Sequence, residues 1–191
     1  MKTFQLEGTP RTEIGKKAAK AIRKEEMIPA VLYGGESTIH FNVTKDAVRK
    51  LIYTPEIYIV DLTIGDKKTK AIIKDLQFHP VTDAVLHIDF LEVFDNKPIV
   101  MEVPVQLEGL AEGVKAGGKL ALQMRKIKVK ALYNVIPEKL TVNVSHLGLG
   151  KTVKVGELSF EGLELISAKE AVVCAVKLTR AARGAAAAAG K

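Results

Sequence analysis

Alternation of apolar and polar residues dominates the first 95 positions, and this period is typical of strands with one buried face. Two segments instead place apolar side chains three or four residues apart: 16–26, and 45–53 with Thr44 as a suitable N-cap. Strands are expected at residues 3–7, 28–33, 39–43, 56–64, 69–78 and 84–94, and a loop at 8–15. This part of the chain is therefore predicted to combine about six strands with two helices.

The pattern changes after the short polar break at 95–98. Beyond it the chain contains strands and Gly-rich turns and no convincing helix, with the clearest strands at 100–107, 127–132, 140–144, 152–155 and 172–178. We therefore expect one domain over residues 1–95 and a second, mainly β domain over residues 96–180. Residues 181–191 form an alanine-rich tail with nothing large enough to anchor it, and we expect disorder there.

Composition narrows the class of protein. The 191 residues are 47% hydrophobic and 27% charged, as in an ordinary globular chain. The N-terminus lacks the apolar segment and cleavage site of a signal peptide, and no run approaches the roughly 18 apolar residues of a spanning helix. The chain is expected to stay in the cytoplasm without a membrane partner. The single cysteine, Cys174, lies in an apolar run and is expected to be a buried strand residue.

Charge points to an anionic partner once its distribution is considered. The formal net charge is +7, but residues 1–95 contain 14 basic and 14 acidic residues, so the excess lies in the second domain. Nucleic acid responds to local potential, because salt screens interactions beyond roughly 8 Å. Residues 9–24 carry one acid, Glu13, against six cations: Arg11, Lys16, Lys17, Lys20, Arg23 and Lys24. This cluster suits a phosphate backbone.

A second basic stretch lies at residues 115–130 and contains no acid. It could be another contact surface. Lys126, Lys128 and Lys130 would share one face of a strand and Ile127 and Val129 the other, which is also the pattern of any solvated amphipathic strand. Both interpretations stay open.

Catalytic and ligand-binding motifs are not supported. Gly148-Leu-Gly-Lys-Thr152 resembles the end of a phosphate-binding P-loop, but its required first glycine would fall at Ser145 and a strand or turn is favoured after it. His79, His87 and Asp89 could suggest a metal centre, yet no second His or Cys pair completes a coordination shell. No activating residue for Cys174 is identifiable. We therefore expect no catalytic residue, no metal, no cofactor and no small-molecule substrate.

The same polar residues suit RNA better. His87 and Asp89 project to one side of a strand, where an imidazole can stack or hydrogen-bond and a carboxylate can accept from a base amino group. Tyr33, at the end of a strand beside two glycines, can add a stacking surface and a hydroxyl. From the residues alone, all three could equally be ordinary sheet residues.

Several motifs resemble those of the bacterial ribosomal protein L25 family. The N-terminal half carries Arg11-Thr-Glu-Ile-Gly-Lys-Lys17, Arg23, Ile28-Pro-Ala-Val-Leu-Tyr-Gly34, Gln77-Phe-His-Pro80 and Leu86-His-Ile-Asp-Phe90. The second half resembles the long, general stress protein branch through Glu102-Val-Pro-Val-Gln-Leu-Glu-Gly109, Gly113-Val-Lys-Ala-Gly-Gly118 and Ile136-Pro-Glu-Lys-Leu140. The resemblance covers nearly the whole chain except the alanine tail.

The resemblance implies a small β-barrel with helices for the first domain and a mainly β second domain. It also implies a structural role, without enzymatic activity, in binding 5S rRNA at the central protuberance of the large ribosomal subunit, beside neighbouring subunit proteins and rRNA. The RNA-binding residues that it implies are Arg11, Lys16, Lys17, Arg23, Tyr33, Gln77, His79, His87 and Asp89. One departure is Glu25-Glu-Met27, where the family often has a small or basic residue and then Gly.

Other functions remain open at this point. A stress-associated protein or a tRNA-binding accessory module is the alternative in the RNA-binding class, because the anticodon-binding part of glutaminyl-tRNA synthetase resembles this family's barrel. A metal-dependent hydrolase is a third possibility in another class, which bound metal in the purified protein would indicate.

Overall fold

The computed structural model describes residues 1–179, and the alanine-rich tail, for which we predicted disorder, lies outside them. The chain divides into two compact units. The N-terminal unit consists of residues 1–99 with 132–134, and the C-terminal unit contains residues 100–131 and 135–179. Within residues 1–179, no helix has the length and apolarity needed to cross a bilayer.

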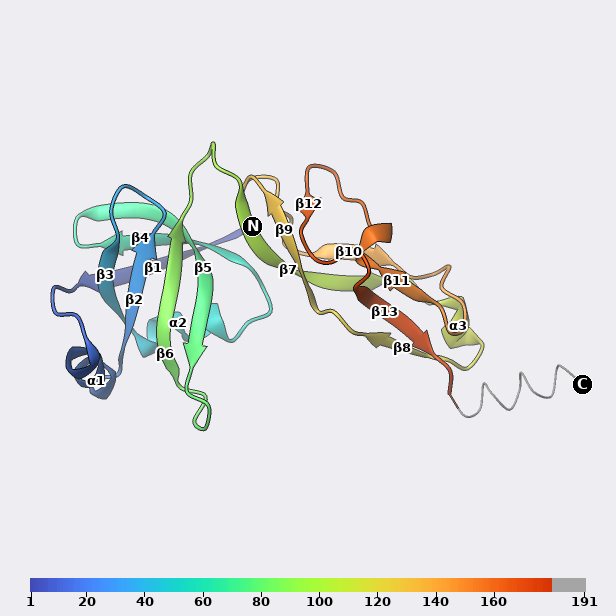
Figure 1. Ribbon diagram of the computed structural model, residues 1–191, viewed down its shortest axis with the longest axis horizontal. Coiled ribbons are helices and arrows are strands. Elements are labelled where there is room, and N and C mark those ends of the chain that lie inside the picture. The colour runs from blue at the N-terminus through green and yellow to red at the C-terminus, as the bar shows by residue number, and fades with distance from the viewer. Residues whose placement is uncertain (180–191) are drawn as a thin grey trace, which may run out of the picture. The chain divides into compact units, whose positions relative to one another are not determined.

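The N-terminal unit is a closed six-stranded barrel in the order β1-β3-β2-β6-β5-β4 (Figure 1). Its strands are β1 (Lys2–Pro10), β2 (Met27–Tyr33), β3 (Ile39–Thr44), β4 (Tyr58–Ile64), β5 (Lys67–Phe78) and β6 (Val85–Glu92). Two pairs are parallel, β1 with β4 and β2 with β6, and the others are antiparallel. The mainly β class and the barrel implied by the family resemblance are thus confirmed.

Strand β1 runs further than its sequence predicts. Residues 8–10, expected to lie in a loop, continue the strand, and Thr9 and Pro10 make its register pairs with Asn42 and Phe41 of β3. Gly8 allows this path, because a Cβ there would lie 2.5 Å from the Phe41 ring. The loop prediction was wrong at these positions, since the need to close the barrel overrides the usual turn preference of Gly and Pro.

The barrel interior is filled by the inward residues of all six strands. Phe41 and Phe90 lie fully buried with ring centroids 5.6 Å apart, and Leu6, Leu32 and Leu62 surround them. Because side chains alternate along each strand, this packing turns the intervening polar residues outward. The polar outer surface of β3, β2, β6 and β5 follows directly from the core.

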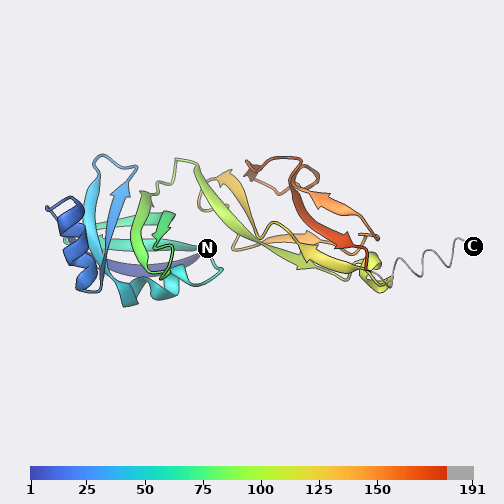
Figure 2. The same ribbon diagram turned by 60° about the horizontal axis from the view of Figure 1, so that its bottom comes forward.

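Two helices flank the barrel, α1 (Lys16–Lys24) and α2 (Lys45–Ile52). Helix α1 buries no residue completely and packs beside β2 (Figures 1 and 2). Helix α2 buries Val48 and Leu51, and Thr44 occupies its N-cap position without a side-chain hydrogen bond. Helix α1 ends two residues before its predicted end, and Glu26 follows in the left-handed region with φ of 58°.

The C-terminal unit contains two small sheets, β10-β7-β9-β12 and β11-β13-β8. Its elements are β7 (Ile99–Glu108), α3 (Glu112–Lys115), β8 (Lys119–Leu122), β9 (Lys126–Ala131), β10 (Leu140–Asn143), β11 (Thr152–Lys154), a 3-10 turn (Val155–Glu157), β12 (Glu164–Leu165) and β13 (Val172–Lys177). The mainly β expectation holds, although the four-residue α3 was not predicted. Cys174 is fully buried on β13, as expected.

Candidate nucleic-acid interface

The centre of the candidate interface is β6, where His87 and Asp89 lie on the same outward face. Nδ1 of His87 lies 2.6 Å from Oδ1 of Asp89. A carboxylate can only accept, so Nδ1 carries the proton, and Nε2 is the remaining ring nitrogen for another partner. Both side chains are about one quarter exposed, at 22% and 27%. The pair is therefore oriented by its own hydrogen bond and still accessible.

Strand register extends this face across four strands. Gln77 on β5 lies directly opposite His87, and Asp75 lies opposite Asp89. On the other side, Val31 of β2 separates Asp89 from His40 of β3. The result is a continuous outward surface over β3, β2, β6 and β5.

Arg23 attaches helix α1 to this surface. Its Nε and Nη2 donate hydrogen bonds of 3.0 and 2.9 Å to the carbonyl oxygen of Leu86, the residue before His87. A fork of two donors to one acceptor fixes the guanidinium plane more firmly than a single contact. The helix thus holds a cation directly beside the His87–Asp89 pair.

Arg11 joins the same corner from the end of β1. Its backbone N–H donates to His40 O at 3.0 Å, and its pKa is lowered by burial and by the nearby charge of Arg23. The buried Nε of Arg11 and the buried Nδ1 of His40 have no hydrogen-bond partner among the described residues. The positive charges of Arg11 and Arg23 thus repel each other at this corner, and a bound anion would offset that repulsion.

Tyr33 lies on the same outward face at the end of β2. Burial raises its pKa, and the negative charges of Asp89 and Asp75 raise it further. The phenol therefore keeps its proton and remains a hydrogen-bond donor at neutral pH. Tyr33 lies two residues along β2 from Val31, which pairs with Asp89, so it shares their outward face.

The remaining predicted residues occupy different positions. Lys16 and Lys17 are exposed in the first turn of α1. His79 lies in the turn between β5 and β6, and its Nδ1 accepts from the backbone N–H groups of Val81 and Thr82 at 3.3 and 3.2 Å. His79 thus has a structural role in shaping this turn, which the sequence did not reveal.

Three polar residues of this surface were not selected from the sequence: His40, Asn42 and Asp75. Alternation in 39–43 indicates that His40 and Asn42 share a face, but it cannot show that β3 lies next to β2. Within residues 1–179, no three His, Cys, Asp or Glu side chains are grouped as metal ligands would be.

Comparisons with known proteins cover the whole described chain. Residues 6–90 match the model of the Ribosomal L25p family, and residues 98–180 match that of the Ribosomal protein TL5, C-terminal domain. A protein of Bacteroides thetaiotaomicron is 72% identical over 196 residues, with both chains covered completely. Relatives from Porphyromonas gingivalis and Azobacteroides pseudotrichonymphae are 71% and 60% identical, each covering at least 96% of both chains. All three are described as large ribosomal subunit protein bL25.

Proposed function

Because the chain belongs to the Ribosomal L25p family, we propose that its N-terminal unit binds 5S rRNA at the central protuberance of the large ribosomal subunit. Its full-length relatives are large-subunit proteins, so the chain is a ribosomal protein of the large subunit and works in the cytoplasm on the ribosome. The family is structural, which supports the expectation that the chain is not an enzyme.

The observation that carries the proposal is the Arg23 anchor beside the His87–Asp89 pair. It places a fixed cation next to a hydrogen-bonded His–Asp pair on strand β6. A-form RNA offers phosphates at its margins and base edges and 2′-hydroxyls in a wide, shallow groove. A basic helix beside a polar sheet face presents complementary groups to both parts.

Each residue then has a distinct role in the proposed complex. Arg11, Arg23, Lys16 and Lys17 contact phosphates, where charge matters more than sequence. Tyr33, Gln77, His87 and Asp89 meet base edges and 2′-hydroxyls, where donor and acceptor positions matter. His79 contributes by holding the β5–β6 turn, with its other ring nitrogen as a contact atom.

The experiment is binding of the full chain to 5S rRNA across a range of salt concentrations. Changing Arg23→Ala together with His87→Ala removes a phosphate contact and an edge contact, and on the order of 100-fold in affinity should be lost. The double variant Arg49→Ala, His146→Ala is the matched control, because both residues are exposed and lie outside the interface. Unchanged affinity of the first variant would refute the site.

Competition with tRNA tests the accessory-module alternative. The proposed function requires that 5S rRNA displaces tRNA from the chain at equal concentration. A preference for tRNA would overturn the assignment of the partner.

A further inference from the structure

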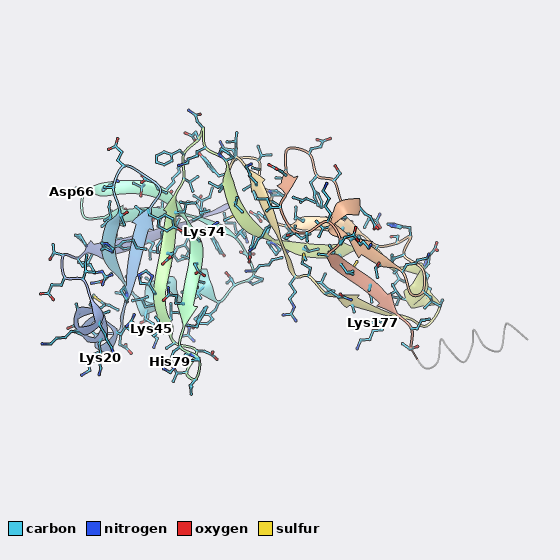
Figure 3. All side chains as sticks on the ribbon, in the orientation of Figure 1. Lys20, Lys45, Asp66, Lys74, His79 and Lys177 are labelled. Atoms are coloured by element: carbon cyan, nitrogen blue, oxygen red, sulfur yellow. The ribbon has the colours of Figure 1, made fainter. Side chains whose placement is uncertain are left out.

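Four lysines at one end of the C-terminal unit come from separate segments: Lys115 at the end of α3, Lys119 at the start of β8, Lys151 before β11 and Lys177 at the end of β13. All four are exposed. Figure 1 shows α3 close to the end of β13, and Lys177 is labelled there in Figure 3.

Strand pairing and loop contacts bring these lysines to the same place. Lys119 and Lys177 are direct partners in the antiparallel pair β8–β13, so their side chains lie on the same face. The N–H of Val176 donates to Lys151 O at 3.0 Å, which holds the Lys151 loop against β13. Thr179 Oγ1 donates to Gly117 O at 2.6 Å and holds the segment after Lys115 there as well.

Glycines allow close packing of the loops next to these four lysines. A Cβ on Gly118 would lie 2.6 Å from the carbonyl oxygen of Gly113 and from Val176. A Cβ on Gly113 would lie 2.6 Å from the backbone of Gly148. The backbones of the two loops are therefore packed directly on each other. Within the Gly148-Leu-Gly-Lys151 segment, Gly150 has a φ of 72°, so the left-handed backbone explains this glycine without any nucleotide.

None of the four lysines forms an ion pair with another residue in 1–179. Lys119 and Lys177 face each other across the ladder, and like charges in that position are destabilising. Lys128 and Lys130 on β9 differ, because Glu102 and Glu164 lie 3.8 and 3.2 Å from their ammonium groups. Within the basic stretch 115–130, Lys128 and Lys130 are thus paired on β9, whereas Lys115 and Lys119 form no ion pair among residues 1–179.

We propose that Lys115, Lys119, Lys151 and Lys177 form a second phosphate-binding surface, which holds the backbone of an rRNA duplex through the C-terminal unit. A polyanion would remove the repulsion that the isolated fold retains. Lysine is depleted in protein–protein interfaces, whereas phosphate backbones accept it as a point charge. The proposal rests on the proposed function only in taking rRNA as the partner, since the surface belongs to a different unit.

The test uses full-length chains and large ribosomal subunits from which this protein has been removed. Lys119→Gln together with Lys177→Gln should leave affinity for isolated 5S rRNA unchanged but weaken binding to the subunits about tenfold. The slope of log affinity against log salt should also become shallower by about 1 to 2, since two phosphate contacts are lost. Lys128→Gln with Lys130→Gln, which removes the same charge from β9, should leave subunit binding near the wild-type value.

Thermal unfolding separates this effect from misfolding. The first double variant should melt no lower than the wild type, because it removes a like-charge pair. Wild-type subunit affinity and salt slope in that variant would overturn the proposal. If the wild-type chain does not bind isolated 5S rRNA, the proposed function is refuted instead.

Crosslinking identifies the partner. A photoreactive amino acid in place of Lys177 should give products with rRNA on the subunit. Products with ribosomal proteins alone would show an acidic protein surface as the partner and would also overturn the proposal.

Discussion

Arg23 and Leu86 lie 63 positions apart in the sequence, yet the guanidinium of Arg23 donates two hydrogen bonds to the carbonyl oxygen of Leu86. This contact joins an exposed helix, which buries no residue completely, to the strand that carries His87 and Asp89. Arg23 therefore adds a polar anchor to the packing of α1 beside β2, and the proposed interface depends on the position of that helix.

Replacing Arg23 by lysine should separate charge from geometry. Arg23→Lys keeps the positive charge but cannot donate from two nitrogens to Leu86, so we expect affinity for 5S rRNA to fall about tenfold. The conservative change Lys24→Arg on the same helix serves as the control and should have little effect. Equal affinities of both variants for 5S rRNA, measured at one salt concentration, would contradict the role given to the two hydrogen bonds from Arg23 to Leu86.

Asp75 should raise the pKa of Tyr33 and weaken the sheet. It lies directly opposite Asp89, so Asp75→Asn should stabilise the fold by about 0.2–0.5 kcal/mol and lower the pKa of Tyr33. Tyrosinate absorbance against pH measures the second effect, with Tyr33→Phe to assign the signal. Asp66→Asn, on the exposed β4–β5 turn, is the control. A Tyr33 titration unaffected by Asp75→Asn would contradict the prediction.

The raised pKa of Tyr33 also predicts how stability depends on pH. The folded state holds the phenol proton more tightly than the unfolded state, whose value is about 10. The contribution of Tyr33 to the free energy of unfolding is therefore complete below about pH 10, and it is lost as the pH rises through the pKa of the folded state. Urea unfolding of the wild type and Tyr33→Phe over this range should show a steeper alkaline loss for the wild type.

Glu26 should be replaceable by glycine with a gain in stability. Its φ of 58° lies in the left-handed region, and its carbonyl accepts from the N–H of Lys45 at 3.1 Å, which fixes the backbone there. Glu26→Gly should raise the free energy of unfolding by about 0.5–1 kcal/mol. Glu25→Gly should lower it, because Glu25 has a φ of −86°. A loss in both variants, seen by urea unfolding, would rule out this account of the helix end.

The thiol of Cys174 should react only slowly with alkylating reagents in the folded protein. Burial raises the pKa of its thiol, so the reactive thiolate is scarce, and the side chain is inaccessible on β13. Iodoacetamide should therefore label native protein far more slowly than protein in denaturing urea. Comparable rates at mildly alkaline pH would mean that β13 opens readily.

Much of the strand order along the chain could be predicted from local patterns. The alternation around Phe41 and Phe90 predicted β3 and β6, and the repeat of Ala18, Ala19 and Ile22 predicted α1. The prediction failed at residues 8–10, because their local preference is for a turn, whereas barrel closure pairs Thr9 and Pro10 with β3. Helix α3 was missed because four residues contain too little periodic signal.

The residues of the candidate site could likewise be predicted in part, but their contacts could not. Alternation placed His87 and Asp89 on one face, the charge cluster indicated Arg11 and Arg23, and the end of a strand indicated Tyr33. The motif resemblance added Gln77 and His79. Neither could show that Gln77 faces His87, that Arg23 reaches Leu86 or that His79 shapes a turn. Those facts depend on which strands become neighbours.

By itself the sequence determined the periodicity of each segment, the basic cluster at 9–24 and the apolar run around Cys174 that predicts a buried strand, because these depend on residues close together in the chain. Only the tertiary structure decided that His40, Asp75 and Asp89 share one surface, and that Lys119 stands opposite Lys177. Strand register is set by the simultaneous packing of a closed core. No local pattern contains that information.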